Sequence, residues 1–147
     1  MSNNTGKPAD FPWLSPYLIV KDVDDAVAFY EKAFGFATRM KLDGDGGGHT
    51  IHAEMNYHDQ VIMLGREDPE GEEKTISPVS SGHKQSMRLY LYCEDVDAFC
   101  QHAEAQGAIV KTKPMDMFWN DRLCSVQDPN GFEWTFATNK GECPNKV

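Results

Sequence analysis

His52 and Glu54 are the side chains of this sequence best suited to acid–base or metal chemistry. They lie two residues apart in the stretch 50–57, whose alternation of polar and apolar residues predicts a strand with both side chains on one face. Histidine titrates near neutral pH and both residue types bind metals, so a metal site or an acid–base pair is one interpretation. The other is a hydrogen-bonded pair on a strand face, which we favour because a metal site needs further ligands from elsewhere.

Arg88 belongs to a second pattern, in which polar and aromatic residues share one face of a predicted strand. Arg88, Tyr90 and Tyr92 alternate there with leucines. A guanidinium binds carboxylate or phosphate through paired hydrogen bonds, and tyrosine rings offer an apolar surface to an organic ligand. The sequence leaves two partners open for Arg88, a ligand anion or Glu133 across the sheet.

Phe118 and Trp119 are neighbouring aromatic residues in a polar connection between two predicted strands. We expect one of them at the mouth of a ligand cleft and the other over the core. No serine lies in a G-x-S-x-G elbow, so a nucleophile is not indicated. The glycine-rich stretch 44–48 lacks the Lys-Ser/Thr pair of a phosphate loop and predicts a turn.

An internal repeat supplies the elements that must position these residues. Each copy runs from apolar strand residues through an Asp-Val-Asp triplet and an amphipathic helix to a glycine. Asp22 and Asp95 are the predicted N-caps, and Gly35 and Gly107 the predicted helix ends. Two copies at half-chain spacing indicate a duplicated module rather than a solenoid. The copies span residues 16–36 and 88–110.

After each predicted helix the hydrophobic period changes to two, as is typical of strands, and the Asp128-Pro129-Asn130-Gly131 stretch predicts a turn. The order is βαβββ, twice. This predicts an α+β fold with mixed β-sheets and helices on the outside. Predicted strands are 17–20, 36–42, 50–57, 61–64, 88–93, 109–112, 123–127 and 132–138. The predicted parts are a tail (1–12), a module (13–65), a linker (66–85), a second module (86–139) and a tail (140–147).

Composition limits the classes of partner. The 147 residues are 40% hydrophobic and 25% charged, which suits an ordinary globular core. A net charge of −9 disfavours nucleic acid and anionic membranes as partners. The apolar runs are far too short to cross a membrane, and the first ten residues contain no secretory signal. The four cysteines form no CxxC pair, which favours reduced thiols in the cytoplasm.

Three segments carry a family resemblance: PYLIVKDVDDAVAFYEKAFGF at 16–36, DVDAF with its following GA in the second copy, and DPNGFEWTF at 128–136. Over about residues 14–138 the chain resembles the vicinal oxygen chelate (glyoxalase/bleomycin resistance protein/dioxygenase) superfamily. HAEM at 52–55, HDQVIML at 58–64 and the stretch 118–134 are most similar to its PhnB-like branch. The resemblance implies that the sheet is open and encloses a cleft, and that this concave sheet holds a catalytic divalent metal in some members and sequesters a drug without metal in others.

The resemblance also implies metal ligands on the first and last strand of each module. At those positions this sequence has Ser15, Met63, Arg88 and Thr135. None is a carboxylate or an imidazole, and Arg88 is a permanent cation with no lone pair to donate. We therefore expect that the family metal site is missing and that no cofactor is bound.

The expected protein is a cytoplasmic homodimer that binds a small aromatic or amphipathic organic molecule in its cleft. The alternative is an enzyme: a lyase, isomerase or dioxygenase with a non-family metal site including His52 and Glu54, or a metal-free acid–base catalyst. The expected ligand-binding residues are Tyr17, His52, Glu54, Met63, Arg88, Tyr90, Trp119 and Thr135.

Overall fold

The computed structural model describes residues 6–44 and 46–147. Contacts divide the chain into two compact units, the first extending to Glu31 and including Gly35–Ile76, and the second combining Lys32–Phe34 with Ser77–Val147. Each sheet has four strands in the same order of connection, so the predicted α+β fold of two βαβββ modules is confirmed. Residues 1–5 of the predicted tail and residue 45 of the predicted turn lie outside the described residues.

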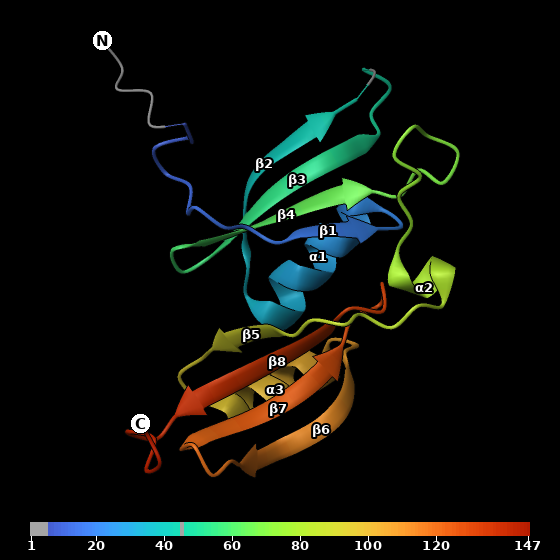
Figure 1. The fold of residues 1–147 in the computed structure, drawn as a ribbon. Coiled ribbons are helices and arrows are strands. Elements are labelled where there is room, and N and C mark those ends of the chain that lie inside the picture. Colours follow the sequence, from blue (N-terminus) through green and yellow to red (C-terminus); the bar gives the residue numbers. More distant parts are fainter. Residues whose placement is uncertain (1–5, 45) are drawn as a thin grey trace. The chain divides into compact units, whose positions relative to one another are not determined.

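The first unit packs one helix against a mixed sheet (Figure 1). In the order β1-β4-β3-β2, β1 is parallel to β4 and the other neighbours are antiparallel. Alternate strand residues such as Leu18, Ala53 and Leu64 are buried beneath the helix, which leaves the intervening residues on the open face. The elements are β1 (Tyr17–Val20), α1 (Val23–Phe34), β2 (Ala37–Asp43), β3 (Thr50–Tyr57) and β4 (Gln60–Arg66).

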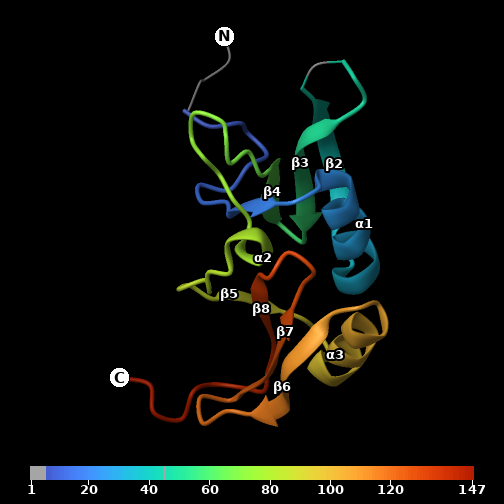
Figure 2. The ribbon, with the colours of Figure 1, turned by 90° about the vertical axis from the view of Figure 1, so that its right-hand side faces the viewer.

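The second unit repeats this arrangement, with α3 on one side of its sheet (Figure 2). The order is β5-β8-β7-β6, and β5 is parallel to β8. Cys124, Trp134 and Phe136 are fully buried at alternate strand positions. The elements are α2 (Pro78–Ser81), β5 (Leu89–Tyr92), α3 (Val96–Ala105), β6 (Ile109–Asp116), β7 (Asp121–Gln127) and β8 (Glu133–Asn139).

Both long helices begin at the predicted N-caps, and α1 ends at the predicted glycine, whereas α3 ends at Ala105, two residues before Gly107. The Asp22 carboxylate accepts a hydrogen bond from the backbone N–H of Asp25 at 2.8 Å, and Asp95 caps α3 in the same way. Gly35 ends α1 in the left-handed region, with φ of 71°. In the second unit Gly107 follows the helix with φ of 106°.

The last turn of α1 contributes to the core of the second unit. The Phe34 ring lies 4.9 Å from that of Phe136 and 5.4 Å from that of Trp134, centroid to centroid. The Asp128 carboxylate accepts a hydrogen bond from the Trp134 indole N–H at 2.9 Å, which joins the predicted turn to this aromatic cluster. Because Trp134 is fully buried, this hydrogen bond fixes the turn against the core.

The segment expected as a linker contains α2 and ends in a side-chain clamp. Gln85 Nε2 donates to the carbonyl oxygens of Glu133 at 2.8 Å and Met87 at 2.7 Å. Its Oε1 accepts from the Glu133 backbone N–H at 3.1 Å. The amide side chain thus substitutes for a ladder pair and holds the entry to β5 beside the start of β8.

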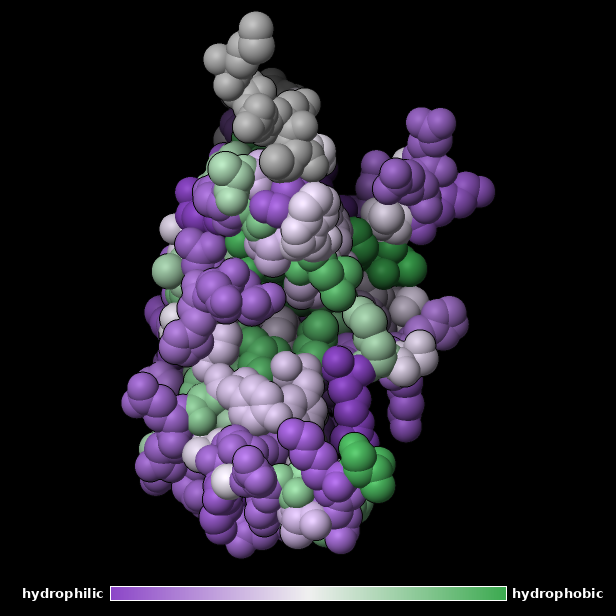
Figure 3. All heavy atoms as spheres, turned by 60° about the vertical axis from the view of Figure 1, so that its left-hand side comes forward, coloured by the Kyte–Doolittle hydropathy of each residue, from purple (hydrophilic) through white to green (hydrophobic). Residues whose placement is uncertain are grey.

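Among the described residues, no helix is long and apolar enough to cross a membrane. The face drawn in Figure 3 mixes hydrophilic side chains with smaller areas of hydrophobic ones. Isolated exposed apolar residues of this kind are ordinary on a protein surface.

Candidate functional site

A chain of hydrogen bonds crosses the open face of the first sheet. The Tyr17 hydroxyl lies 3.1 Å from His52 Nδ1, and His52 Nε2 lies 3.5 Å from Glu54 Oε1. Burial and the Glu73 carboxylate raise the pKa of Tyr17, so its hydroxyl stays protonated and donates to Nδ1. With Nδ1 as the acceptor, Nε2 is the ring nitrogen that faces Glu54.

Gly65 makes this hydrogen-bond chain possible, because the Tyr17 ring passes over β4 at this residue. Tyr17 pairs with Met63 on β4, and Gly65 pairs with His52 on β3. A Cβ at position 65 would lie 2.6 Å from both Cε1 and the hydroxyl oxygen of Tyr17. The missing side chain therefore lets a tyrosine of β1 reach a histidine of β3.

Arg39 anchors the acidic end of the chain. Its Nε lies 3.2 Å from Glu54 Oε2, while the same guanidinium pairs with Asp10 and stacks 4.5 Å over the Phe11 ring. Sequence reasoning missed Arg39 because it lies in a register shift of β2, where strict alternation fails. With one oxygen of Glu54 held by a cation, the other oxygen faces the His52 imidazole on the same strand.

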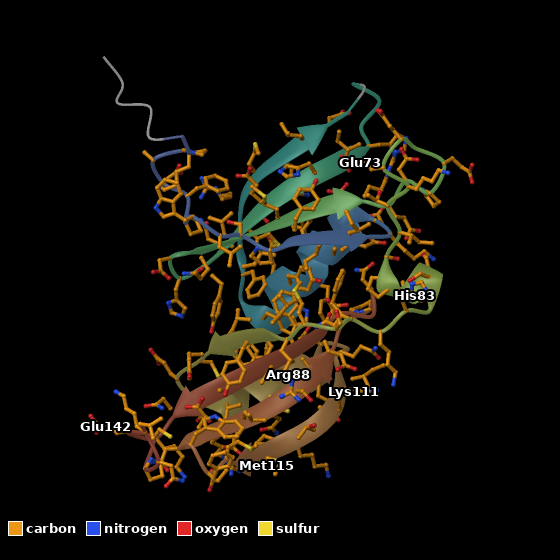
Figure 4. All side chains as sticks on the ribbon, viewed as in Figure 1. Glu73, His83, Arg88, Lys111, Met115 and Glu142 are labelled. Carbon is orange, nitrogen blue, oxygen red and sulfur yellow. The ribbon has the colours of Figure 1, made fainter. Side chains whose placement is uncertain are left out.

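The open face of the second sheet is hollowed near the start of β5. A cavity of about 320 Å³ is lined by the charged groups Arg88, Lys111 and Glu133 and by the hydroxyls of Ser125 and Thr135. Figure 4 shows Arg88 lying over the strands on the side opposite α3. Two cations and one carboxylate give this hollow a positive charge, although the chain as a whole carries −9.

Among the described residues, no carboxylate pairs with Arg88. The ion pairs formed within residues 6–44 and 46–147 do not include Arg88, Lys111 or Glu133. The Arg88–Glu133 pair that the sequence allowed is therefore not formed in the described part of the chain. The planar fork of N–H donors on Arg88 faces the hollow and its solvent.

Farther along β5, two tyrosines share one buried carboxylate. The hydroxyls of Tyr90 and Tyr92 donate to Asp121 Oδ2 at 2.7 and 3.0 Å, and Asn139 Nδ2 donates to Oδ1 at 2.9 Å. The two tyrosine rings are 5.6 Å apart with an interplanar angle of 65°. Asp121 is only 3% exposed. Sequence reasoning missed it because the predicted strand began at residue 123, and its alternation with Leu123 on β7 is the signal that could have placed it on this face.

Asp121 stays ionised despite its burial. Burial alone raises the pKa of its carboxyl, but hydrogen bonds from Tyr90, Asn139, Tyr92 and Trp119 outweigh burial and hold the pKa below its usual value. Burial and the bond to Asp121 raise the pKa of Tyr90 to about 12. Both tyrosines therefore remain protonated donors to a negative carboxylate at neutral pH.

A tight turn places Trp119 beside Asp121 and Tyr90. Asn120 adopts a φ of 67°, and the Trp119 side chain lowers the pKa values of the Asp121 carboxyl and the Tyr90 hydroxyl. The Phe118 ring packs edge-on against Trp119 at 4.8 Å and is 72% exposed. Both rings thus lie outside the buried core.

The structure brings the expected ligand-binding residues together as two groups, one on each sheet. The first sheet carries Tyr17, His52, Glu54 and Met63, and the second sheet carries Arg88, Tyr90, Trp119 and Thr135.

Comparison with known proteins identifies the family. The model of the Glyoxalase/Bleomycin resistance protein/Dioxygenase superfamily matches residues 11–136. The chain belongs to this superfamily. A curated relative, uncharacterized protein Mb0911c of Mycobacterium bovis (strain ATCC BAA-935 / AF2122/97), is 36% identical over 127 residues, covering 86% of this chain and 82% of its own length.

Two solved structures of similar fold are informative. TioX from Micromonospora sp. ML1 matches with a TM-score of 0.68 at 25% identity, over 86% of this chain and 97% of its own. TnmS3 from Streptomyces sp. CB03234, described as an antibiotic binding protein, matches with a TM-score of 0.65 at 20% identity, over 90% of this chain and 99% of its own.

The residues at the positions that the resemblance gives for the superfamily metal ligands are poor donors for a divalent cation. Ser15 and Thr135 offer only neutral hydroxyls, Met63 a soft thioether and Arg88 a cation. Elsewhere in the described residues, no three His, Cys, Asp or Glu side chains converge. His52 and Glu54 already use Nδ1 and Oε2 in bonds to Tyr17 and Arg39.

Proposed function

We propose that this superfamily member is a binding protein that takes a small amphipathic organic anion without a metal. The observation that carries the proposal is the exposed Arg88 guanidinium, which faces a hollow of about 320 Å³ and has no carboxylate partner in the described chain. Bidentate binding of a carboxylate or phosphate is the strongest interaction open to such a group. The likeness to a structure described as an antibiotic binding protein supports binding as the function class.

The hollow also suits the rest of such a ligand. Lys111 provides a second cation, and Met87 and Leu123 provide apolar contact for a hydrocarbon body. Arg88 immediately precedes β5 and Tyr90 lies two residues further on, so a ligand held by its anion at Arg88 reaches an aromatic ring at the next position on that side.

Substitution of Arg88 tests the proposal, with benzoate as the anionic probe and benzamide as its neutral match. We expect the wild type to prefer benzoate and Arg88→Ala to weaken benzoate binding about 10- to 100-fold, since a charge-assisted bond contributes roughly 1.5–3 kcal/mol. Titration calorimetry measures the affinities. Thermal unfolding should be unchanged, because Arg88 is exposed and makes no ion pair among the described residues.

Arg66→Ala is the matched control, an exposed arginine at the end of β4 that should leave benzoate binding unchanged. Equal affinity of wild type and Arg88→Ala for benzoate would refute the proposal. So would a stoichiometric divalent metal in protein purified without chelators.

A second candidate function is metal-free acid–base catalysis on the first sheet. It is favoured by the Tyr17–His52–Glu54 chain, in which an exposed hydroxyl is backed by an imidazole and a carboxylate. A ligand that is turned over by the wild type but only bound by His52→Gln would replace the first proposal with this one.

Three finer statements remain proposals. We place the chain in the PhnB-like branch of the superfamily, on the segments 52–55, 58–64 and 118–134. We expect it to work in the cytoplasm, since its four cysteines are free thiols. We also expect a homodimer, as the resemblance implies.

A further inference from the structure

The aromatic corner lies on the open face of the second sheet beyond the Arg88 hollow. We define it as the rings of Tyr90, Tyr92, Phe118 and Trp119 around the Asp121 carboxylate. Tyr90 and Tyr92 meet at 65°, and Phe118 and Trp119 meet at 88°. Tyr92 and Phe118 are 53% and 72% exposed, so aromatic surface is open to a ligand.

The carboxylate beneath these rings sets the electrostatics of the corner. Asp121 receives two phenolic hydrogen bonds on one oxygen and an amide bond on the other, while being 3% exposed. A phenol that donates to a carboxylate gains electron density in its ring, which strengthens the negative ring face. No cation of the described chain pairs with Asp121, so its charge is balanced only by these donors.

We propose that the aromatic corner binds an organic cation, an alkylated ammonium group seated on the Tyr92 and Trp119 rings. Electron-rich ring faces with a fixed negative charge behind them attract a poorly hydrated cation. A metal ion does not suit the corner, because its single carboxylate is buried and its oxygens already accept hydrogen bonds. A neutral aromatic ligand would pack against the rings, but it would have no electrostatic attraction to the Asp121 carboxylate.

The corner and the Arg88 hollow share a strand face. Arg88 lies just before β5, and Tyr90 and Tyr92 follow at alternate positions of the strand, so the anion and cation sites are separated by roughly 7–13 Å, the span of two to four extended residues. If the proposed function also holds, one ligand that carries both a carboxylate and an ammonium group fits the face. The cation site itself does not depend on that condition.

Choline and its neutral isostere 3,3-dimethylbutan-1-ol are the probes for the cation site. We expect the Trp119 indole N–H resonance to shift with choline, and choline to bind roughly 10-fold more tightly than the alcohol. Asp121→Asn and Tyr92→Leu should each remove this preference. Tyr92→Leu serves if Asp121→Asn fails to fold, because Tyr92 is half-exposed.

Tyr57→Leu is the matched control, since this tyrosine lies at the end of β3 in the first unit. Equal binding of choline and the alcohol by the wild type, no choline binding, or full choline preference in folded Tyr92→Leu would each overturn the inference. Arg88→Ala should keep choline binding while losing benzoate, so the two proposals fail separately.

Discussion

At the scale of residues, a missing side chain determines what the first sheet can do. Gly65 leaves the space in which the Tyr17 ring lies, and that ring carries a hydroxyl to His52. Gly65 does not adopt a positive φ, so the backbone conformation does not require a glycine at this position. The role of Gly65 is to let the Tyr17 ring pack closely against β4, and the hydrogen bond to His52 on the adjacent strand depends on this packing.

We expect Gly65→Ala to displace the Tyr17 ring and break its bond to His52. Because the ring is half-exposed and can move away, the free energy of unfolding should change by no more than about 1 kcal/mol. The measurement is the ¹⁵N chemical shift of His52 Nδ1, which should move as it does in Tyr17→Phe. In the Tyr17→Phe background, Gly65→Ala should add no further shift; an additional shift would mean that Gly65 acts on His52 independently.

The individual residues of the candidate site were the hardest feature to predict from the sequence. The alternation of β3 and β5 was enough to place His52, Glu54 and the β5 tyrosines on open faces, because period two is a local property. Arg39 and Asp121 were missed because their partners lie on other strands, and a register shift or turn decides which partner each one meets.

At the scale of elements, the clamp formed by Gln85 controls how the chain enters β5. Its amide makes three hydrogen bonds to backbone groups, two of them to Glu133. Both residues also line the Arg88 hollow, so the clamp holds one wall of the proposed ligand site.

Gln85→Ala should lower the free energy of unfolding by about 1–3 kcal/mol, since it leaves three backbone groups without their partner. Urea denaturation measures this change, and hydrogen exchange at the Glu133 amide should become faster. Gln101→Ala, at an exposed position of α3, is the control and should change stability by less than about 0.5 kcal/mol. An unchanged exchange rate at Glu133 in the clamp variant would show that the clamp is not formed.

Elements with local signals were predicted well. The caps of α1 and α3 and the bounds of β1 and β3 match, because an aspartate before an amphipathic run and strict alternation are visible in a few residues. β6 was predicted to end at residue 112 but continues to Asp116. Register shifts between Val110 and Met115 interrupt its alternation, and only pairing with β7 reveals its length.

At the scale of the whole molecule, apolar surface near the N-terminus bears on assembly. Trp13 and Leu14 are consecutive and are 79% and 82% exposed. Tryptophan is enriched at protein interfaces, and two neighbouring apolar residues at such exposure favour a contact with a second copy.

We expect light scattering at micromolar concentration to give twice the 16.5 kDa mass of the chain. Leu14→Asp should reduce the mass to that of a monomer, because it places a charge in the apolar contact. Leu42→Asp, at a 47%-exposed position of β2, is the control and should remain dimeric. A monomer mass for the wild type would contradict the prediction.

The distribution of the second unit along the chain has a consequence for synthesis on the ribosome. Phe34 is made early, yet its ring partners Trp134 and Phe136 emerge about a hundred residues later. A nascent or prematurely terminated chain that lacks residues 134–136 therefore leaves the Phe34 ring without two of its aromatic neighbours. Such fragments present a ready target for chaperones and proteases until the final strand has been translated.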